Sequence, residues 1–513
     1  MKYPIGIQNF EGLRKDGYAY VDKTALMYQL IDQGKYYFLS RPRRFGKSLL
    51  LSTLRAYFEG KRELFDGLAI AEIEKEWKKY PILYLDLNVD KFASAQALED
   101  YLNQAVTVWE REYGLDTVER TIPLRFMGVI KRAAQQTGRR VVILIDEYDK
   151  PLIQNIDNPA VQDEMRSTLK AFYGVLKTMD EFIQFAFLTG VTKFGKVSVF
   201  SDLNHLNDLS LDLRYADICG VSETELHRYF DSGVEELAQA YGITKEACYD
   251  RLRTNYDGYH FHPKSEGIYN PFSLLTTLSK KEFGDYWFET GTPTLLVRQL
   301  QKTGYNLEHI TQEEVTTDVL NSIDVMNENP LPLIYQSGYL TIKDYDEVFD
   351  VYTLGFPNRE VETGFIKFLV PYYLPRPTAS GVFSVRNFVR EIQGGQAEAF
   401  TRRLQALFAD GNYQVVGNEE VYFQNTLYVL FKLLGFYVEV ERHTTDGRMD
   451  ILMQTPQYIY IIELKVDQTA LIALQQIEDK QYAAPFALDD RKLYKIGINF
   501  NTVTRRIDDW AIE

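Results

Sequence analysis

Residues 36–48 have the sequence YYFLSRPRRFGKS, and the fold class follows from this stretch. Its first five residues predict a short buried strand, and a helix with an apolar face is expected to begin near Lys47. Backbone N–H groups at a helix N-terminus attract phosphate, so the intervening loop lies where a nucleotide-binding loop is needed. The usual pattern begins with glycine, whereas this loop begins with Arg41. The strand–loop–helix context favours phosphate binding over an ordinary helix start.

The loop supplies groups for ATP and Mg²⁺. Lys47 is expected to reach the β- and γ-phosphates, and Ser48 is expected to ligate Mg²⁺. Arg43 and Arg44 either stabilise charge on the transferred phosphoryl group or pair with nearby carboxylates, and the sequence favours neither role. The residues expected to contact nucleotide here are Arg43, Arg44, Phe45, Gly46, Lys47, Ser48 and Leu49.

A second strand carries the carboxylates that such a site needs. Residues 141–145 are VVILI, an unbroken run that suits a parallel strand covered on both faces, and Asp146 and Glu147 follow directly. Asp146 is expected to bind the Mg²⁺, and Glu147 to polarise the attacking water. The alternative is a solvated strand end that continues as a charged turn. Another strand, 184–189, ends at Thr189, which is expected beside the γ-phosphate.

The order of elements predicts an α/β protein. Strands alternate with helices over the first part of the chain, as in a parallel P-loop NTPase sheet. The middle then becomes helical, and prolines concentrate before a final unit that opens with helices and ends with strand pairs. The expected domains are 1–215 (P-loop ATPase), 216–345 (helical or winged-helix lid), 346–385 (linker) and 386–513 (a C-terminal α/β domain).

A hairpin near the C-terminus brings two carboxylates and a lysine together. Strand-like runs flank a turn, and a turn centred on residues 456–457 places Asp450 opposite Glu463. Side chains alternate along a strand, so Lys465 shares the face of Glu463. Opposed Cβ atoms lie about 5 Å apart, which allows both carboxylates to hold one Mg²⁺ or Mn²⁺. Proline disfavours the tightest hairpin turns, so a shifted register is the alternative.

These charges occupy a largely apolar strand, where an unpaired carboxylate or ammonium is costly. A buried ion pair of Lys465 with Glu463 or Asp450 would satisfy them without any catalytic role. The pattern favours the catalytic interpretation, in which Lys465 orients or activates the water that attacks a phosphodiester. Glu420, at the start of an amphipathic helix, is expected to reach the metal from the side. Gln476, on a helix after the hairpin, either points at the site or is solvated.

Composition limits the function classes. The chain has 513 residues, which exceeds one hydrophobic core, and its formal charge is −15 at pH 7. A net-acidic chain does not bind nucleic acid non-specifically, so contact has to come from local basic patches. Two cysteines, Cys219 and Cys248, support neither a disulfide framework nor a structural zinc site. We expect no signal segment, no membrane span and a cytoplasmic location.

The motifs resemble two families. The sequences RPRRFGKS (41–48), IDEYD (145–149), LTGVTKF (188–194) and NP (270–271) look like the AAA-like ATPases of gut and oral anaerobic bacteria. In that family the loop carries arginine where most phosphate loops have glycine. The C-terminal motifs GRMD (447–450), ELK (463–465) and QI (476–477) are similar to the PD-(D/E)XK nuclease superfamily.

The resemblance implies an ATPase domain, a helical or winged-helix segment and a restriction-endonuclease-like core. It implies Asp450, Glu463 and Lys465 as the nuclease triad, with Glu420 as an accessory. The leading hypothesis is an ATP-driven switch or motor that controls nucleic-acid cleavage, with DNA as the expected substrate, and the resemblance suggests a role in defence or in mobile elements. One alternative is a regulatory ATPase whose last domain binds nucleic acid or a partner without cutting. Another is a nuclease that binds nucleotide without turnover. The sequence leaves a homo-oligomer open.

Overall fold

A computed structural model describes residues 1–89, 91–193, 206–288, 294–311, 313–320, 329–374, 385–409, 419–435, 438–445 and 448–513. The chain forms two compact units. The first contains residues 1–291 and 311–362, and the second contains residues 292–310 and 363–513. None of the described helices combines the length and the apolar composition needed to cross a lipid bilayer.

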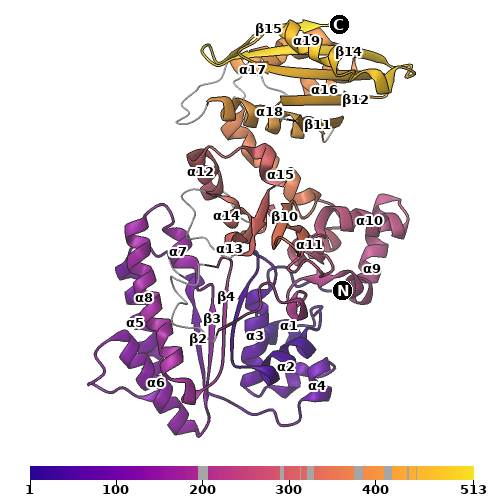
Figure 1. Cartoon of the computed structure of the whole chain (residues 1–513). Helices are drawn as coiled ribbons and strands as arrows, with labels where there is room; N and C mark the ends of the chain where they lie inside the picture. Colours follow the sequence, from indigo (N-terminus) through magenta and orange to yellow (C-terminus); the bar gives the residue numbers. More distant parts are fainter. Residues whose placement is uncertain are drawn as a thin grey trace. The chain divides into compact units, whose positions relative to one another are not determined.

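The first unit contains a parallel sheet whose described strands lie in the order β2-β3-β4-β1-β5, and Figure 1 shows β2, β3 and β4 side by side. The interior strand β3, which lies between β2 and β4, is buried along its whole length, as its unbroken apolar run predicts. The parallel sheet expected from the sequence is therefore confirmed. The strands are β1 (Tyr36–Ser40), β2 (Ile82–Asp86), β3 (Val141–Asp146), β4 (Ile183–Gly190) and β5 (Asn207–Asp208).

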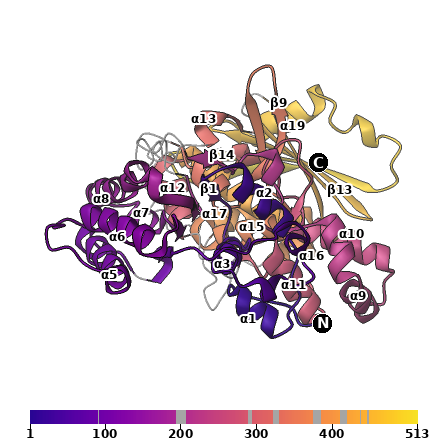
Figure 2. The same cartoon turned by 90° about the horizontal axis from the view of Figure 1, so that it is seen from below.

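Helices cover this sheet on both sides. Helices α5, α6 and α8 pack together on one side, and α3 lies on the other, a grouping that is also visible from below (Figures 1 and 2). The side chains of Ser94 and Thr121 cap α5 and α6, which end at Gly114 and Gly138. The helices are α1 (Phe10–Lys15), α2 (Thr24–Gln33), α3 (Lys47–Phe58), α4 (Ala69–Ile73), α5 (Ala95–Tyr113), α6 (Ile122–Thr137), α7 (Lys150–Gln154) and α8 (Pro159–Thr178).

The middle of the chain is helical with small sheets, as expected. A capping box of Ser222 and Glu225 starts α9, and the Asn270 side chain caps α11. One small sheet has the order β8-β10-β9, and β6 pairs with β7. The elements are β6 (Val221–Ser222), α9 (Glu223–Tyr241), α10 (Lys245–Tyr256), β7 (Ile268–Tyr269), α11 (Pro271–Lys280), α12 (Thr294–Thr303), β8 (Glu314–Thr316), α13 (Thr317–Leu320), α14 (Leu331–Gln336), β9 (Thr341–Asp346) and β10 (Val351–Gly355).

The linker expected at 346–385 is corrected by the structure. Its described part contains β10 and helix α15 (Arg359–Tyr373), and the division between the units falls within that helix. Pro371 lies inside α15, but an apolar face outweighs it, because Val361, Phe365, Ile366 and Leu369 are all fully buried. The lid expected at 216–345 is likewise divided, because residues 292–310 belong to the second unit.

The second unit contains a mixed sheet in the order β11-β12-β13-β14-β15. Strands β13 and β14 run parallel, and the other neighbours pair antiparallel. Helix α19 packs against β13 and β14. The restriction-endonuclease-like α/β fold is thus confirmed. The elements are α16 (Val385–Gln393), α17 (Ala397–Ala409), α18 (Glu419–Gly435), β11 (Glu439–Thr445), β12 (Arg448–Gln454), β13 (Tyr458–Val466), α19 (Ala470–Asp479), β14 (Lys492–Asn501) and β15 (Arg506–Ile512).

Candidate functional sites

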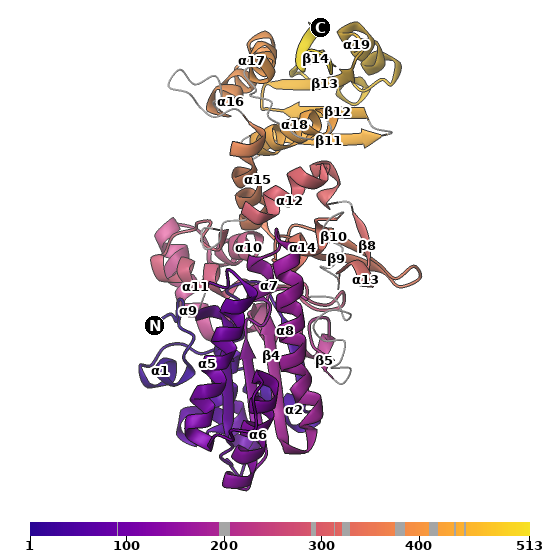
Figure 3. The same cartoon turned by 90° about the vertical axis from the view of Figure 1, so that its left-hand side faces the viewer.

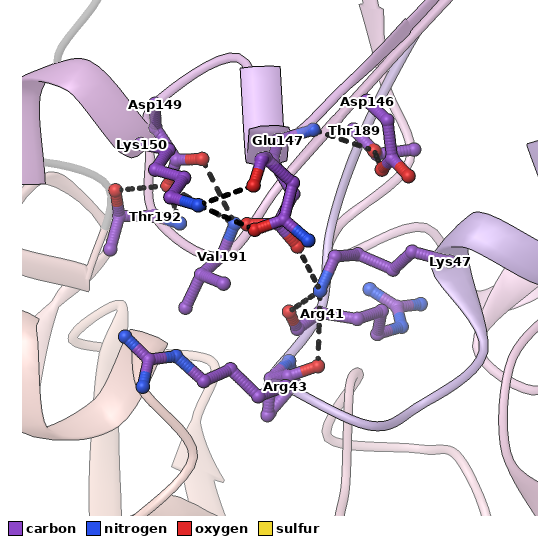
Figure 4. Close-up of polar contacts among 12 residues, drawn as sticks. Arg41, Arg43, Lys47, Asp146, Glu147, Asp149, Lys150, Thr189, Val191 and Thr192 are labelled. Carbon is purple, nitrogen blue, oxygen red and sulfur yellow. Dashed lines mark hydrogen bonds and ion pairs between the residues drawn. The ribbon is translucent and has the colours of Figure 1, made fainter. Parts of the chain in front are cut away.

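The loop between β1 and α3 holds a buried cation. Gly46 has a φ of 97°, which glycine adopts without Cβ strain, and Lys47 begins α3. The Lys47 Nζ donates hydrogen bonds to the carbonyl oxygens of Arg41 (2.9 Å) and Pro42 (3.2 Å). It also lies 3.6 Å from Glu147 Oε1 (Figure 4). The loop and the end of β3 therefore hold the lysine between them.

The ends of β3 and β4 carry the expected polar residues. Thr189 is fully buried, and its Oγ1 donates to Asp146 Oδ1 over 2.5 Å. The Glu147 N–H donates to the same threonine oxygen over 3.4 Å. Glu147 has a φ of 55°, a left-handed conformation that costs a residue with a Cβ about 1–3 kcal/mol. Strain at this residue is consistent with a functional position.

The register of the sheet adds a carboxylate that the sequence interpretation missed. Asp86 ends β2 directly beside Asp146. Burial raises the pKa of Asp86, and the carboxylates of Asp146 and Glu147 raise it further. Negative charge therefore concentrates at this edge of the sheet. The detectable signal was an aspartate that ends an apolar strand of a parallel sheet, because the carboxyl ends of such strands meet at one edge.

Asp149 is buried, so the alternative of a solvated charged turn is wrong for this residue. Its carboxylate accepts hydrogen bonds from Val191 N (3.1 Å), Thr192 N (2.5 Å) and Thr192 Oγ1 (2.5 Å) (Figure 4). Burial raises the pKa of Asp149, and the nearby Glu147 carboxylate raises it further. Asp149 thus ties the end of β3 to the segment that follows β4. Lys150 is more exposed than Asp149, and its ammonium donates hydrogen bonds to the side chain and the carbonyl oxygen of Asn88.

Arg41 is a structural residue in the loop. Its side chain is 1% exposed and donates to the carbonyl oxygens of Ser40 (2.9 Å), Ser210 (3.0 Å) and Tyr215 (3.1 Å). The guanidinium carbon lies 4.0 Å from the centroid of the Phe261 ring. Burial lowers the pKa of Arg41 to about 10. The arginine at the first loop position therefore joins the loop to segments from the middle of the chain.

The two other arginines of the loop differ in their surroundings. The Arg44 guanidinium lies over the Phe272 ring at 4.9 Å from its centroid. Arg43 is exposed, and Figure 4 shows its side chain extending away from the Lys47 ammonium. The Phe45 ring packs edge-on against Tyr259, with 4.8 Å between centroids. Phe45 can therefore serve a nucleotide only through its backbone.

Two further loop residues were expected to contact nucleotide. Ser48 and Leu49 lie in the first turn of α3 and are both partly buried. A serine hydroxyl and the Asp146 carboxylate are oxygen donors of the kind that Mg²⁺ binds, so the residues present fit that ion. Contact of the loop residues and of Thr189 with a nucleotide stays a prediction.

The C-terminal hairpin has the predicted register. Strands β12 and β13 pair antiparallel with Asp450 directly opposite Glu463. The Thr455 N–H donates to Tyr458 O over 2.9 Å, and the Thr455 hydroxyl accepts from Tyr458 N over 2.9 Å. The threonine hydroxyl therefore closes a turn that accommodates proline without a shift of register.

Glu463 and Lys465 lie side by side in the interior. Their side chains are 0% and 4% exposed, and Lys465 Nζ lies 2.7 Å from Glu463 Oε1. The same ammonium donates to Gln476 Oε1 over 2.5 Å, so the glutamine of α19 points at the pair, as one of the two expectations had it. Glu463 Oε2 is buried and has no hydrogen-bond partner among the described residues. A buried carboxylate oxygen of this kind fits a divalent cation.

The rest of the expected metal site is not visible in side-chain detail. Strand β12 places the backbone of Asp450, and α18 begins at Glu419, but the side chains of Asp450 and Glu420 lie outside the described residues. Within the described part of the chain, no three His, Cys, Asp or Glu side chains gather as a metal site would require. The roles of Asp450 and Glu420 therefore stay predictions.

Comparisons with known proteins match two parts of the chain. A family model described as a predicted AAA-ATPase matches residues 4–200, and a model of the PD-(D/E)XK nuclease superfamily matches residues 418–510. The chain belongs to these two families. A relative described as an uncharacterized protein in the vnfD 5′ region of Azotobacter chroococcum is 35% identical over 522 residues, which cover 100% of this chain and 99% of the relative.

The matched ranges of this AAA-ATPase-like nuclease fusion contain the sites described above. The AAA-ATPase match spans the phosphate loop, Asp146, Glu147 and Thr189. The PD-(D/E)XK match spans β12, β13 and α19, and thus Glu463 and Lys465. The relative aligns with this chain over its full length, and thus over both matched ranges.

Proposed function

We propose that this protein binds and hydrolyses ATP at the loop around Lys47, and that this activity regulates or powers metal-dependent cleavage of nucleic acid, with DNA as the substrate. The observation that carries the proposal is the environment of Glu463. One of its oxygens binds the Lys465 ammonium, and the other is buried without a hydrogen-bond partner among the described residues. An unsatisfied buried acceptor costs about 1–3 kcal/mol. A bound cation offsets this cost.

At the first site, the chain's own residues would bind and orient ATP. The N–H groups at the start of α3 and the Lys47 ammonium attract the phosphates, which would take the place of Glu147 and the loop carbonyls around Lys47. Mg²⁺ held by Ser48 and Asp146 would neutralise charge on the phosphates. The Glu147 carboxylate, released from Lys47, would accept a proton from the attacking water. Arg43 is exposed in the same loop and would stabilise charge on the phosphoryl group.

At the second site, Glu463 and Asp450 would hold the metal on one face of the hairpin, with Glu420 in reach from α18. A bound Mg²⁺ or Mn²⁺ would supply a water of lowered pKa and a positive charge beside the phosphodiester. Lys465, fixed by Glu463 Oε1 and Gln476 Oε1, would orient that water and stabilise negative charge in the transition state.

A crossed pair of variants in the full-length protein tests both activities. Cleavage of duplex, single-stranded and branched substrates is measured with and without ATP, in Mg²⁺ and in Mn²⁺, and ATP hydrolysis is measured in parallel. Glu463→Ala should lower cleavage by about 10³-fold or more and retain ATP hydrolysis, since it removes a metal ligand. Glu147→Gln should lower ATP hydrolysis by about 10²–10⁴-fold, the usual contribution of a general base.

Glu478→Ala is the matched control for the nuclease half. Glu478 is exposed on α19, where it pairs with Lys495, and its loss should leave cleavage unchanged. Metal-dependent cleavage that survives Glu463→Ala would refute the nuclease assignment. The alternative would then hold, namely a regulatory ATPase whose last domain binds nucleic acid or a partner without cutting. If ATP hydrolysis survives Glu147→Gln, another residue activates the attacking water, and Asp149 is the first candidate. A role in defence or mobile elements, a cytoplasmic location and a homo-oligomer stay predictions.

A further inference from the structure

The two units are joined by more than one covalent connection. The chain passes between them at 291/292, at 310/311 and at 362/363. The last of these lies within α15, a helix of 15 residues that begins in the first unit and ends in the second. A continuous helix transmits displacement along its axis because backbone hydrogen bonds join each turn to the next, and in α15 Pro371 removes only the bond of its own missing N–H. The first and last turns of α15 therefore show what it connects.

The start of α15 is bound to the phosphate loop through one tryptophan. Glu360 is 2% exposed, and its Oε1 accepts hydrogen bonds from Trp287 N (2.7 Å) and Ser273 Oγ (2.8 Å). The indole Nε1 of the same tryptophan donates to the carbonyl oxygen of Arg43 over 3.0 Å. Trp287 is 5% exposed, so both bonds form in the interior. Two hydrogen bonds therefore separate the phosphate loop from α15.

The end of α15 is bound to α18, the helix with which the match to the nuclease superfamily begins. The carbonyl oxygen of Tyr373, the last residue of α15, accepts hydrogen bonds from Thr426 Oγ1 (3.2 Å) and Tyr422 OH (3.4 Å). Both donors belong to α18, which carries the expected metal ligand Glu420 in its first turn. Helices α15 and α18 lie next to each other in two views (Figures 1 and 3).

The segment 292–310 holds the same helix at a second point. Asn425 of α18 is 2% exposed, and its Oδ1 accepts from Leu307 N (2.8 Å) while its Nδ2 donates to Tyr305 O (2.8 Å). A buried amide is costly unless both halves are bonded, and here both are. The asparagine thus fixes the position of α18 against the segment 292–310. Both ends of that segment continue into the first unit.

We propose that Trp287, Glu360 and Thr426 are positioning residues through which the nucleotide state of the phosphate loop sets the position of α18, and with it the nuclease site. This inference rests on the proposed function of both sites. Nucleotide that reorganises the loop around Lys47 moves the Arg43 carbonyl, and the displacement passes through Trp287 and Glu360 to α15 and then to α18. A misplacement of about 1 Å at a catalytic ligand lowers a rate by about 10²-fold, so a small shift suffices.

Thr426→Val tests the relay at its α18 end, because it removes one hydroxyl and keeps the shape of the side chain. Thr401→Val is its matched control. Both threonines are almost fully buried in the second unit, and both donate to the carbonyl four residues earlier, but the single Thr426 proton is shared between Tyr422 O (2.8 Å) and Tyr373 O (3.2 Å). At the other end, Trp287→Phe removes the indole donor to Arg43 O. Trp109→Phe, in α5, is its control.

Two quantities are measured on the full chain at saturating nucleotide. The first is the ratio of DNA cleavage with and without Mg-ATP, and the second is hydrogen exchange of residues 419–435 with and without Mg-ADP. In the wild type, nucleotide should change the cleavage rate by at least about fivefold, a typical allosteric coupling, and should change exchange in α18. Thr426→Val and Trp287→Phe should each reduce the cleavage ratio to less than about twofold, and the double variant should add nothing further. Both control variants should behave as the wild type.

The two proposals fail in different ways. The relay is overturned if hydrogen exchange in α18 of the wild type does not change with nucleotide. It is also overturned if the Thr426→Val protein keeps the full change in cleavage rate and exchange on nucleotide binding. Both outcomes are independent of what the protein cleaves. Exchange in α18 that follows nucleotide and is lost in Thr426→Val supports the relay. If that response occurs while Glu463→Ala cleaves like the wild type, the nuclease assignment fails and the relay stands.

Discussion

Arg41 is a buried cation without a carboxylate among its hydrogen-bonded partners. Its partners are three carbonyl oxygens and an aromatic face, and a guanidinium can satisfy such a set because its donors form a rigid fork. Transfer of a charge to the interior is costly, and neutral oxygens offset only part of that cost. The residue nevertheless fills space that glycine would leave empty. Its contribution is therefore to hold the loop against Ser210 and Tyr215.

Arg41→Gly should destabilise the protein, although it restores the residue that most phosphate loops have at this position. The change leaves a cavity and removes the donors to two buried carbonyl oxygens, which together cost about 3 kcal/mol or more. Denaturant titration followed by tryptophan fluorescence should show a lower midpoint for the first unit. Arg43→Gly, the same change at an exposed position of the same loop, should shift the midpoint far less. Equal midpoints for Arg41→Gly and wild type would contradict this account.

At the scale of elements, α19 packs so closely against β14 that the contact leaves no space for a side chain at Gly497. Gly497 of β14 lies opposite Glu463, and a Cβ atom placed on it would meet Ala470 O at 2.2 Å. That oxygen belongs to the backbone of α19, so it cannot rotate away. The close approach brings Gln476 to the Lys465 ammonium. The glycine therefore sets the distance between α19 and the sheet strands β13 and β14.

Gly497→Ala should displace α19 and separate Gln476 from Lys465, lowering cleavage by about 10–100-fold, as loss of supporting contacts usually does. ATP hydrolysis, measured on the same sample, should be retained. Gly435→Ala is a control in the same unit, since a Cβ there would meet only Val440 at an ordinary 3.9 Å. Cleavage at the wild-type rate in Gly497→Ala would show that the position of α19 does not matter for Lys465.

Sequence patterns predicted the secondary-structure elements that depend on residues close together in the chain. The runs at 36–40 and 141–145 are short and apolar, so both strands and the loop between β1 and α3 could be predicted. The position of one turn was enough to place Asp450 opposite Glu463. Burial of Asp149 could not be predicted in this way, because its donors Val191 and Thr192 lie more than 40 residues further along. Nor could the partners of Arg41, which lie 169 and 174 residues away in the chain.

At the scale of the whole molecule, the charge of −15 opposes the approach of nucleic acid. Contact with a duplex is then expected to depend on a few cations near the nuclease site, and Lys480, which is exposed one turn after Gln476 at the end of α19, is the candidate that we choose. Added salt weakens the attraction of such cations to phosphate, but it also screens the repulsion from the net charge. The two effects oppose each other. An acidic nuclease should therefore show a weak dependence of binding on salt.

We expect the logarithm of the binding constant to fall with the logarithm of salt concentration with a slope shallower than about −3, the value for about three phosphate contacts. Fluorescence anisotropy with a labelled duplex measures this, using Glu463→Ala so that the substrate stays intact. Lys480→Gln should make the slope shallower by about 1, because one contact to phosphate is lost. Lys75→Gln, at an exposed position in the first unit, should leave it unchanged. A slope of about −6 or steeper would mean that an extended basic surface binds the duplex, and the local-contact account would then fail, because repulsion from the acidic remainder can only flatten the slope.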